Sequence, residues 1–156
     1  MTTGAELRAL MRRFPSGVAV VTVELDGERI GLTVGTLVSL SLEPPLVGFA
    51  VGRHAALLEL LRRAGRFGVS LLAADQDTLA AHFARGVPPI GMWHGIELLD
   101  TEGPPLLAGA LGWLRGQLVS EQDTGDHRFF VGAIEHVELG RAGPPLVYVG
   151  QQYAAS

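Results

Sequence analysis

The sequence has 156 residues, no cysteine, a formal net charge of −4 and a hydrophobic fraction of 47%. This length suits one domain with its own core, so we expect a single domain over residues 1–156. The lack of cysteine excludes disulfides, thiolate metal ligands and cysteine nucleophiles. The chain is acidic overall and has no cluster of basic residues, which argues against nucleic acid as a partner. The sequence contains no run of roughly 18 apolar residues, so no membrane span is expected.

Only 18% of the residues are charged, which is little for a surface that faces water everywhere. We therefore expect a second copy of the chain to cover part of it, in a homodimer. Residues 1–13 carry charges in a helical pattern rather than the composition of a secretory signal. A cytoplasmic location is the resulting expectation.

The first elements in chain order are a helix and a hairpin. Apolar residues recur at helical spacing over residues 5–13, and a proline follows, so a short amphipathic helix is expected there. A β-branched run then predicts a strand over 18–23. Asp26-Gly27 predicts a tight turn into the next strand, which starts at residue 29.

A segment rich in hydroxyls and small residues comes next, from Gly31 to Leu46, and it ends at a Pro-Pro pair. The remaining expected elements are a strand at 46–51, a helix at 55–64, a strand at 67–72, a helix at 75–83, a long loop at 85–105, and strands at 111–119, 127–138 and 146–149. Strands outnumber helices, and tight turns join several of them. This pattern favours a mainly β fold, an antiparallel barrel with a few peripheral α-helices, over a doubly wound sheet.

The hydroxyls of the segment 31–46 belong to Thr33, Thr36, Ser39 and Ser41, which alternate with apolar residues. Burying an unpaired hydroxyl costs on the order of 1–3 kcal/mol, so each needs a partner. Two interpretations remain open. The hydroxyls either pair with the backbone where strands end, or they are available to a polar ligand such as a flat heterocycle.

Two other motifs carry candidate chemistry. Gly125-Asp126-His127 predicts a turn before a strand, and it would place an imidazole at the mouth of the barrel as a proton donor or amide partner. Arg53-His54 precedes a predicted helix, where a phosphate could sit. A solvent-exposed turn histidine and a plain surface arginine are the respective alternatives. None of the five histidines has the spacing of a metal-binding motif, so no metal site is expected.

Several short blocks also occur in a specific order along nearly the whole chain. They are Phe14-Pro-Ser-Gly-Val18, Gly31-Leu-Thr-Val34, Ser39-Leu-Ser-Leu-Glu-Pro-Pro45, Gly65-Arg-Phe67, Ala73-Ala-Asp-Gln76, Pro105-Leu-Leu-Ala-Gly-Ala-Leu-Gly-Trp-Leu114, Gly125-Asp-His127 and Pro145-Leu-Val-Tyr148. In order and spacing they resemble the flavin reductase family of the split β-barrel superfamily. The resemblance implies a homodimeric NAD(P)H:flavin oxidoreductase that transfers a hydride from nicotinamide to N5 of FMN or FAD. It also implies a two-component monooxygenase as the partner that receives reduced flavin.

The same resemblance assigns roles to individual residues. The isoalloxazine and ribityl chain would be lined by Thr33, Gly35, Thr36, Leu37 and Ser39. The phosphate would be met by Arg53, His54 and Ala55. Ser70 would take the place of an asparagine beside the flavin. His127 matches the family's histidine by the nicotinamide, as the catalytic residue, and Asp126 belongs to the cofactor-binding set.

The chain departs from the family pattern at three positions: Gly35 replaces a side chain able to hydrogen-bond, Val38 replaces the common Thr, and Ser70 replaces the usual Asn. Each lost contact is worth roughly 0.5–1.5 kcal/mol. The alternative function is a flavin-free barrel that binds an apolar natural-product intermediate in the same cavity and catalyses a cyclisation, cycloaddition or isomerisation. A binding module that senses a small-molecule ligand such as flavin is a third interpretation.

Overall fold

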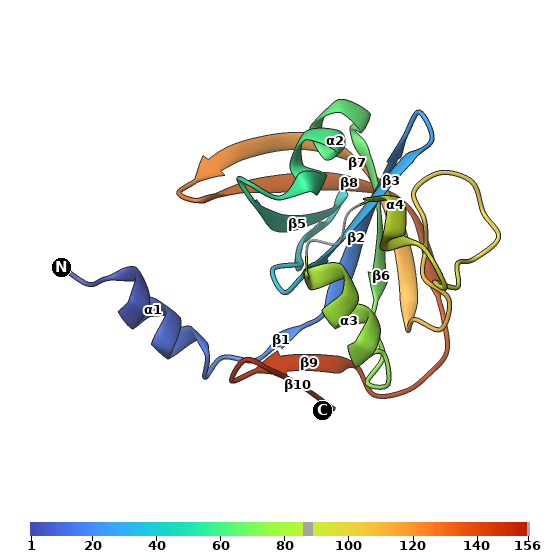
Figure 1. Ribbon diagram of the computed structural model, residues 1–156. Helices are drawn as coiled ribbons and strands as arrows, with labels where there is room; N and C mark the ends of the chain where they lie inside the picture. The colour runs from blue at the N-terminus through green and yellow to red at the C-terminus, as the bar shows by residue number, and fades with distance from the viewer. Residues whose placement is uncertain (86–88, 156) are drawn as a thin grey trace.

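The computed structural model describes residues 1–85 and 89–155 (Figure 1). Its helices are α1 (Gly4–Met11), α2 (Ala56–Ala64), α3 (Asp77–Ala84) and α4 (Pro89–Met92). Its strands are β1 (Ser16–Gly17), β2 (Ala19–Leu25), β3 (Glu28–Val34), β4 (Val38–Leu42), β5 (Pro45–Gly52), β6 (Arg66–Leu71), β7 (Gly112–Thr124), β8 (His127–Leu139), β9 (Leu146–Val149) and β10 (Gln152–Ala155).

Seven of these strands form one antiparallel sheet in the order β3-β2-β6-β7-β8-β5-β4. The sheet curls so that β3, at one edge, comes close to β5 near the other edge. A small second sheet, β1-β9-β10, joins the N-terminal and C-terminal segments below the barrel (Figure 1). The expected mainly β antiparallel barrel with peripheral helices is confirmed. Among the described residues, no helix combines the length and the apolar character needed to cross a membrane.

Aromatic rings fill the barrel core. The Phe67 ring packs edge-on against Phe49 at 5.1 Å between centroids, and Phe49 stacks on Phe130 at 5.9 Å. All three side chains are fully buried. Gly132 leaves the room that Phe67 occupies, because a Cβ at this position would lie 2.3 Å from Phe67 Cζ. The core of the barrel therefore depends on a glycine opposite a large ring.

The segment predicted as a long loop at 85–105 is only partly irregular. It contains α4, and an isolated β-bridge joins Leu98 to Leu107. Trp93 anchors it to the barrel, because its indole N–H donates to the Arg29 carbonyl at 2.9 Å and its ring packs on Phe83. Residues 86–88 of the predicted loop lie outside the described residues. The single turn of α4 is too short for sequence periodicity to reveal it.

Other boundaries differ from the expectations for local reasons. α3 begins at Asp77 rather than at residue 75, because the Gln76 side chain accepts a hydrogen bond from the Ala73 backbone N–H and holds the preceding turn. The strand expected at 111–119 continues to Thr124 as one arm of a long hairpin. β4 lies within the hydroxyl-rich segment, and β10 follows the last expected strand.

Candidate functional site

Strand β5 brings most of the predicted site residues together. Along one side it pairs with β4, where Ser39 faces Val47, and the Thr36 hydroxyl binds the Ala50 backbone just beyond. Along its other side it pairs with β8, where Gly52 faces His127. Arg53, His54 and Ala55 follow directly at its end. Thr36, Ser39, residues 53–55 and residues 126–127 therefore lie beside β5, from Val47 to just past the end of the strand.

His127 opens β8 immediately after a tight turn. Gly125 has a φ of 71°, in the left-handed region that favours glycine. The His127 Nδ1 lies 2.7 Å from Asp126 Oδ1, and this contact lowers the pKa of the Asp126 carboxyl. An ionised carboxylate only accepts hydrogen bonds, so Nδ1 carries the hydrogen. Within the described residues Nε2 has no partner, which leaves this nitrogen available to a ligand.

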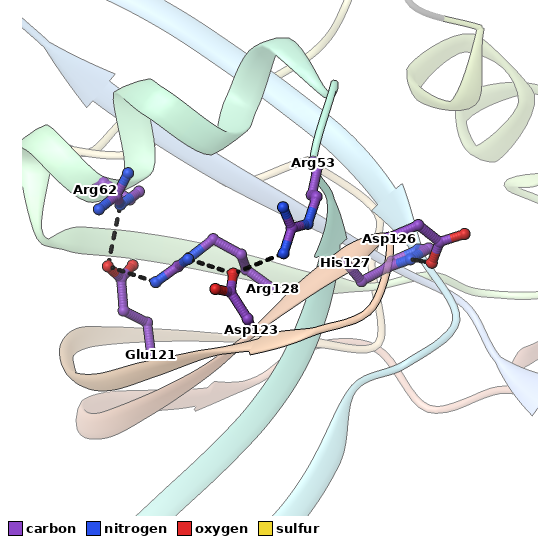
Figure 2. A network of polar contacts seen from close by, with 7 residues as sticks. All are labelled: Arg53, Arg62, Glu121, Asp123, Asp126, His127 and Arg128. Atoms are coloured by element: carbon purple, nitrogen blue, oxygen red, sulfur yellow. Dashed lines mark hydrogen bonds and ion pairs between the residues drawn. The ribbon is translucent and has the colours of Figure 1, made fainter.

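The turn that carries His127 is tied to Arg53. The Arg53 backbone N–H donates to the Asp126 carbonyl at 3.0 Å. The Arg53 side chain reaches Asp123 at 3.1 Å between Nη2 and Oδ1, as Figure 2 shows. Helix α2 begins next, and its N-cap residue Ala55 offers no side-chain cap to the first N–H groups. An exposed arginine beside an uncapped helix N-terminus is suited to a phosphate group.

The hydroxyl-rich segment resolves mostly into internal pairing. Thr33 Oγ1 donates to the Ala80 carbonyl at 2.6 Å. Thr36 Oγ1 accepts from the Ala50 N–H at 2.9 Å and donates to its carbonyl at 3.2 Å. Ser39 is exposed on β4. Of the two interpretations of these hydroxyls, backbone pairing therefore holds for Thr33 and Thr36.

Gly35 lies between two hollows of the surface. A cavity of about 200 Å³ is bordered by Thr33, Gly35 and the rings of Tyr148 and Tyr153. A wider hollow of about 500 Å³ extends from Gly35 and Thr36 to α1, where Arg8, Met11, Arg12 and Phe14 line it. A Cβ at Gly35 would lie 2.8 Å from Ser16 Oγ, so a larger residue here would require the Ser16 side chain to shift. The hollows give a flat ligand apolar walls beside the predicted segment.

Two predicted residues lie apart from this arrangement. Ser70 is fully buried in β6, and its hydroxyl accepts from the Leu107 backbone N–H at 2.9 Å. Because the hydroxyl is engaged inside the sheet, the structure does not offer it to a ligand. Leu37 is half-buried, packs against the core and borders a separate cavity with Leu71 and Leu146. These side chains stabilise the barrel wall.

Sequence reasoning missed the acidic residues that meet the arginines around the His127 turn. Asp123 contacts both Arg53 and Arg128, and Glu121 contacts both Arg128 and Arg62 (Figure 2). Their sequence signal is a pair of acidic residues two positions apart, Glu121 and Asp123, just before the predicted turn. Over the described ranges 1–85 and 89–155, no cluster of three or more His, Asp or Glu side chains could hold a metal ion.

Comparison with known proteins decides the family. Residues 11–156 match the family described as flavin reductase like domain. This chain belongs to that family. The match covers the barrel, the His127 turn and α2, so the family resemblance read from the sequence is confirmed.

Individual relatives cover almost the whole chain. The reductase component of 4-hydroxyphenylacetate 3-monooxygenase from Thermus thermophilus is 48% identical over 92% of this chain and 90% of its own. The NADH:FAD oxidoreductase SgcE6 of Streptomyces globisporus, solved in complex with NAD and FAD fragments, superposes with a TM-score of 0.89 at 32% identity, over 96% of this chain and 90% of its own. An actinorhodin polyketide dimerase from Streptomyces coelicolor is 34% identical over 96% of this chain and 84% of its own.

Proposed function

We propose that this flavin reductase family member oxidises NADH or NADPH and reduces FMN or FAD, which it supplies to a partner monooxygenase. The observation that carries the proposal is the meeting of His127, Arg53 and the N-terminus of α2 at the end of β5. Relatives whose names describe NADH-dependent flavin reductases and a monooxygenase reductase component support it.

The residues present fit a flavin phosphate. Arg53 supplies a cation whose side chain is 46% exposed, and α2 supplies backbone N–H groups that no side chain caps. The neighbouring hollows supply the apolar wall that a planar ring system needs. Polar recognition of the ring by the Thr33 and Thr36 hydroxyls is limited, because both already bind the backbone. Arg53, His54 and Ala55 would thus hold the phosphate, and Gly35 and Ser39 would face the ring or ribityl chain.

Bound flavin supplies the hydride acceptor, at N5, for the reduced nicotinamide. The part of the protein is to bind and align. Asp126 holds the His127 ring through Nδ1. The free Nε2 can then accept a hydrogen bond from the nicotinamide amide. The hydrogen bond from the Arg53 backbone N–H to the Asp126 carbonyl fixes the proposed phosphate site relative to this imidazole. Alignment of two reactants in one site is a major source of rate.

The test mixes the purified chain with FMN or FAD and with NADH or NADPH, and follows the nicotinamide absorbance. Flavin-dependent oxidation of at least one nucleotide is expected. His127→Ala should lower kcat/KM about two- to thirteenfold, the value of one lost hydrogen bond of about 0.5–1.5 kcal/mol. His94→Ala, at an exposed histidine outside the site, is the matched control and should change little. Absence of oxidation with every flavin and nucleotide pair would refute the proposal.

A flavin-free barrel is the second candidate. The pairing of the Thr33 and Thr36 hydroxyls with backbone groups favours it, because these hydroxyls are then not available to bind a flavin. A family relative named as a polyketide dimerase gives it further support. Such a chain would hold an apolar intermediate in the hollow beside Gly35 and steer its cyclisation. Saturable binding of FMN or FAD by the purified protein would count against this candidate.

The proposal includes a homodimer, because no residue of α1 is buried against the rest of the chain. The helix projects from the barrel (Figure 1). Its apolar side chains Leu7, Leu10 and Met11 are all exposed. A second copy of the chain would cover this face and the hollow beside it.

Sedimentation tests this part of the proposal. Leu10→Glu should shift the chain from dimer to monomer at equal concentration, without unfolding it, because Leu10 is an exposed side chain of a helix that has no buried residue. Ala9→Glu, on the opposite face of α1, adds the same charge and should leave the dimer intact. A wild-type chain that sediments as a monomer would contradict the proposed dimer. A cytoplasmic location, where NAD(P)H is available, is also proposed and is tested by cell fractionation.

A further inference from the structure

A chain of alternating charges surrounds the His127 turn (Figure 2). Arg53 Nη2 lies 3.1 Å from Asp123 Oδ1, and Arg128 Nη1 lies 2.5 Å from the same oxygen. Arg128 Nη2 is 3.2 Å from Glu121 Oε1, which also accepts from Arg62 Nε at 3.0 Å. Three arginines and two carboxylates thus run from the end of β5 across the hairpin to α2.

The pairing register of the strands produces this arrangement. Asp123 on β7 faces Arg128 on β8, and Arg128 in turn faces Val51 on β5. Arg53 follows two residues later, so its side chain can reach back over β8 to Asp123. Asp123 is held on the hairpin by Arg128 whether or not it also contacts Arg53, because the Arg128 contact is the shorter of the two.

Asp123 therefore forms an ion pair with the arginine that would hold the flavin phosphate. Arg53, Asp123 and Arg128 together carry a charge of +1, from two guanidinium groups and one carboxylate. The Arg53–Asp123 pair is open to solvent, with side chains 46% and 60% exposed. Exposed pairs of this kind contribute little to folding stability. Their charge still acts on an anion that arrives at the same guanidinium.

Resting on the proposed function, we propose that Asp123 competes with the flavin phosphate for Arg53 and so lowers the affinity of the chain for FMN. A phosphate that binds Arg53 must displace the Asp123 carboxylate or lie beside it, and either event costs free energy. The remaining nitrogens of Arg53 stay available, so binding is weakened rather than abolished. This competition suits an enzyme that must release reduced flavin to a partner. Asp123 is on this account a residue that tunes specificity for the phosphate.

The test compares FMN with riboflavin, which lacks the phosphate. Fluorescence titrations measure the Kd of both flavins for wild type and for Asp123→Asn, which keeps an acceptor for Arg128 but removes the charge. FMN should bind about two- to fivefold more tightly to the variant, the range expected from releasing one exposed ion pair, while riboflavin binding stays unchanged. The gain should shrink as salt is added. Asp100→Asn, at an exposed carboxylate that forms no ion pair among the described residues, is the charge-matched control.

A double-mutant cycle completes the experiment. In an Arg53→Gln background the Asp123→Asn change should no longer affect FMN binding. Weaker or unchanged FMN binding by Asp123→Asn would overturn the inference, since it would mean that Asp123 orients Arg53 or does not act on it. An equal change for riboflavin would overturn it too. A wild-type chain that binds neither flavin would refute the proposed function itself, whereas the other outcomes leave that function standing.

Discussion

Replacing Ser70 with alanine separates a structural role of this hydroxyl from a role in binding flavin. Ser70 and Leu107 are both fully buried, and the Ser70 Oγ is the acceptor for the Leu107 backbone N–H at 2.9 Å. The Leu107 carbonyl is held in turn by the indole N–H of Trp113 at 2.7 Å. Ser70 and Trp113 face each other on β6 and β7, so the two bonds fix one peptide segment against the sheet.

The expected effect of Ser70→Ala follows from this geometry. The variant leaves a buried N–H without a partner, which costs about 1–3 kcal/mol of unfolding free energy. For a chain of this size each kcal/mol lowers Tm by about 2–4 °C, so a decrease of roughly 2–12 °C is expected. The Kd for FMN should stay within about twofold of wild type, since Ser70 is fully buried and lines neither of the two hollows beside Gly35.

Urea unfolding followed by tryptophan fluorescence measures the first quantity, and an FMN titration measures the second. Protein concentration must be equal for all variants, because a dimer unfolds in a concentration-dependent way. Ser120→Ala, at an exposed serine on β7, is the control and should change neither quantity. Unchanged stability together with a clearly weaker affinity for FMN would refute the structural role of Ser70 and place this hydroxyl at the flavin.

Two further predictions concern the barrel and its acid stability. Gly132→Ala should destabilise the fold by about 1–3 kcal/mol in urea, because its Cβ would overlap the buried Phe67 ring, whereas Gly17→Ala meets no atom within 4 Å and should be nearly neutral. The hydrogen bond from Arg141 holds the pKa of Asp75 below its usual range. Stability from this pair is present above the usual aspartate pKa and is lost as pH falls through the lowered value. Arg141→Gln should therefore show a smaller loss of stability between about pH 5 and pH 2 than wild type, and an identical pH profile would contradict this reasoning.

Local patterns in the sequence predicted the elements that periodicity and turn chemistry specify. The buried run of β2 and the amphipathic α2 were found for that reason, and Gly125-Asp126 was found as a turn. β1 and β10 were not, because β1 has two residues and its pairing with β9 joins the two ends of the chain. Short strands that exist through a distant partner leave no local signal.

The residues of the candidate site also divide into those that a local sequence pattern marks and those that depend on contacts between distant segments. His127 and Arg53 could be proposed from the sequence because a turn and a helix start mark them locally. The Asp123 contact to Arg53 could not, because it joins residues 70 positions apart and depends on the registers of β7, β8 and β5. Ser70 was assigned to the flavin from its position in the family pattern, and only burial reveals that its hydroxyl serves Leu107.

The distribution of polar partners explains how this chain could bind a flavin with a segment that keeps few free hydroxyls. Thr33 fastens β3 to α3, and Thr36 fastens the turn after β3 to β5, so both build the wall rather than contact what lies against it. Selectivity for a flavin would then depend on the phosphate end, where Arg53 and the start of α2 lie, and on His127 Nε2. A ligand held chiefly at its charged end is sensitive to any nearby charge. The carboxylate of Asp123, which forms an ion pair with Arg53, is therefore placed where a single charge can change the affinity for the flavin phosphate.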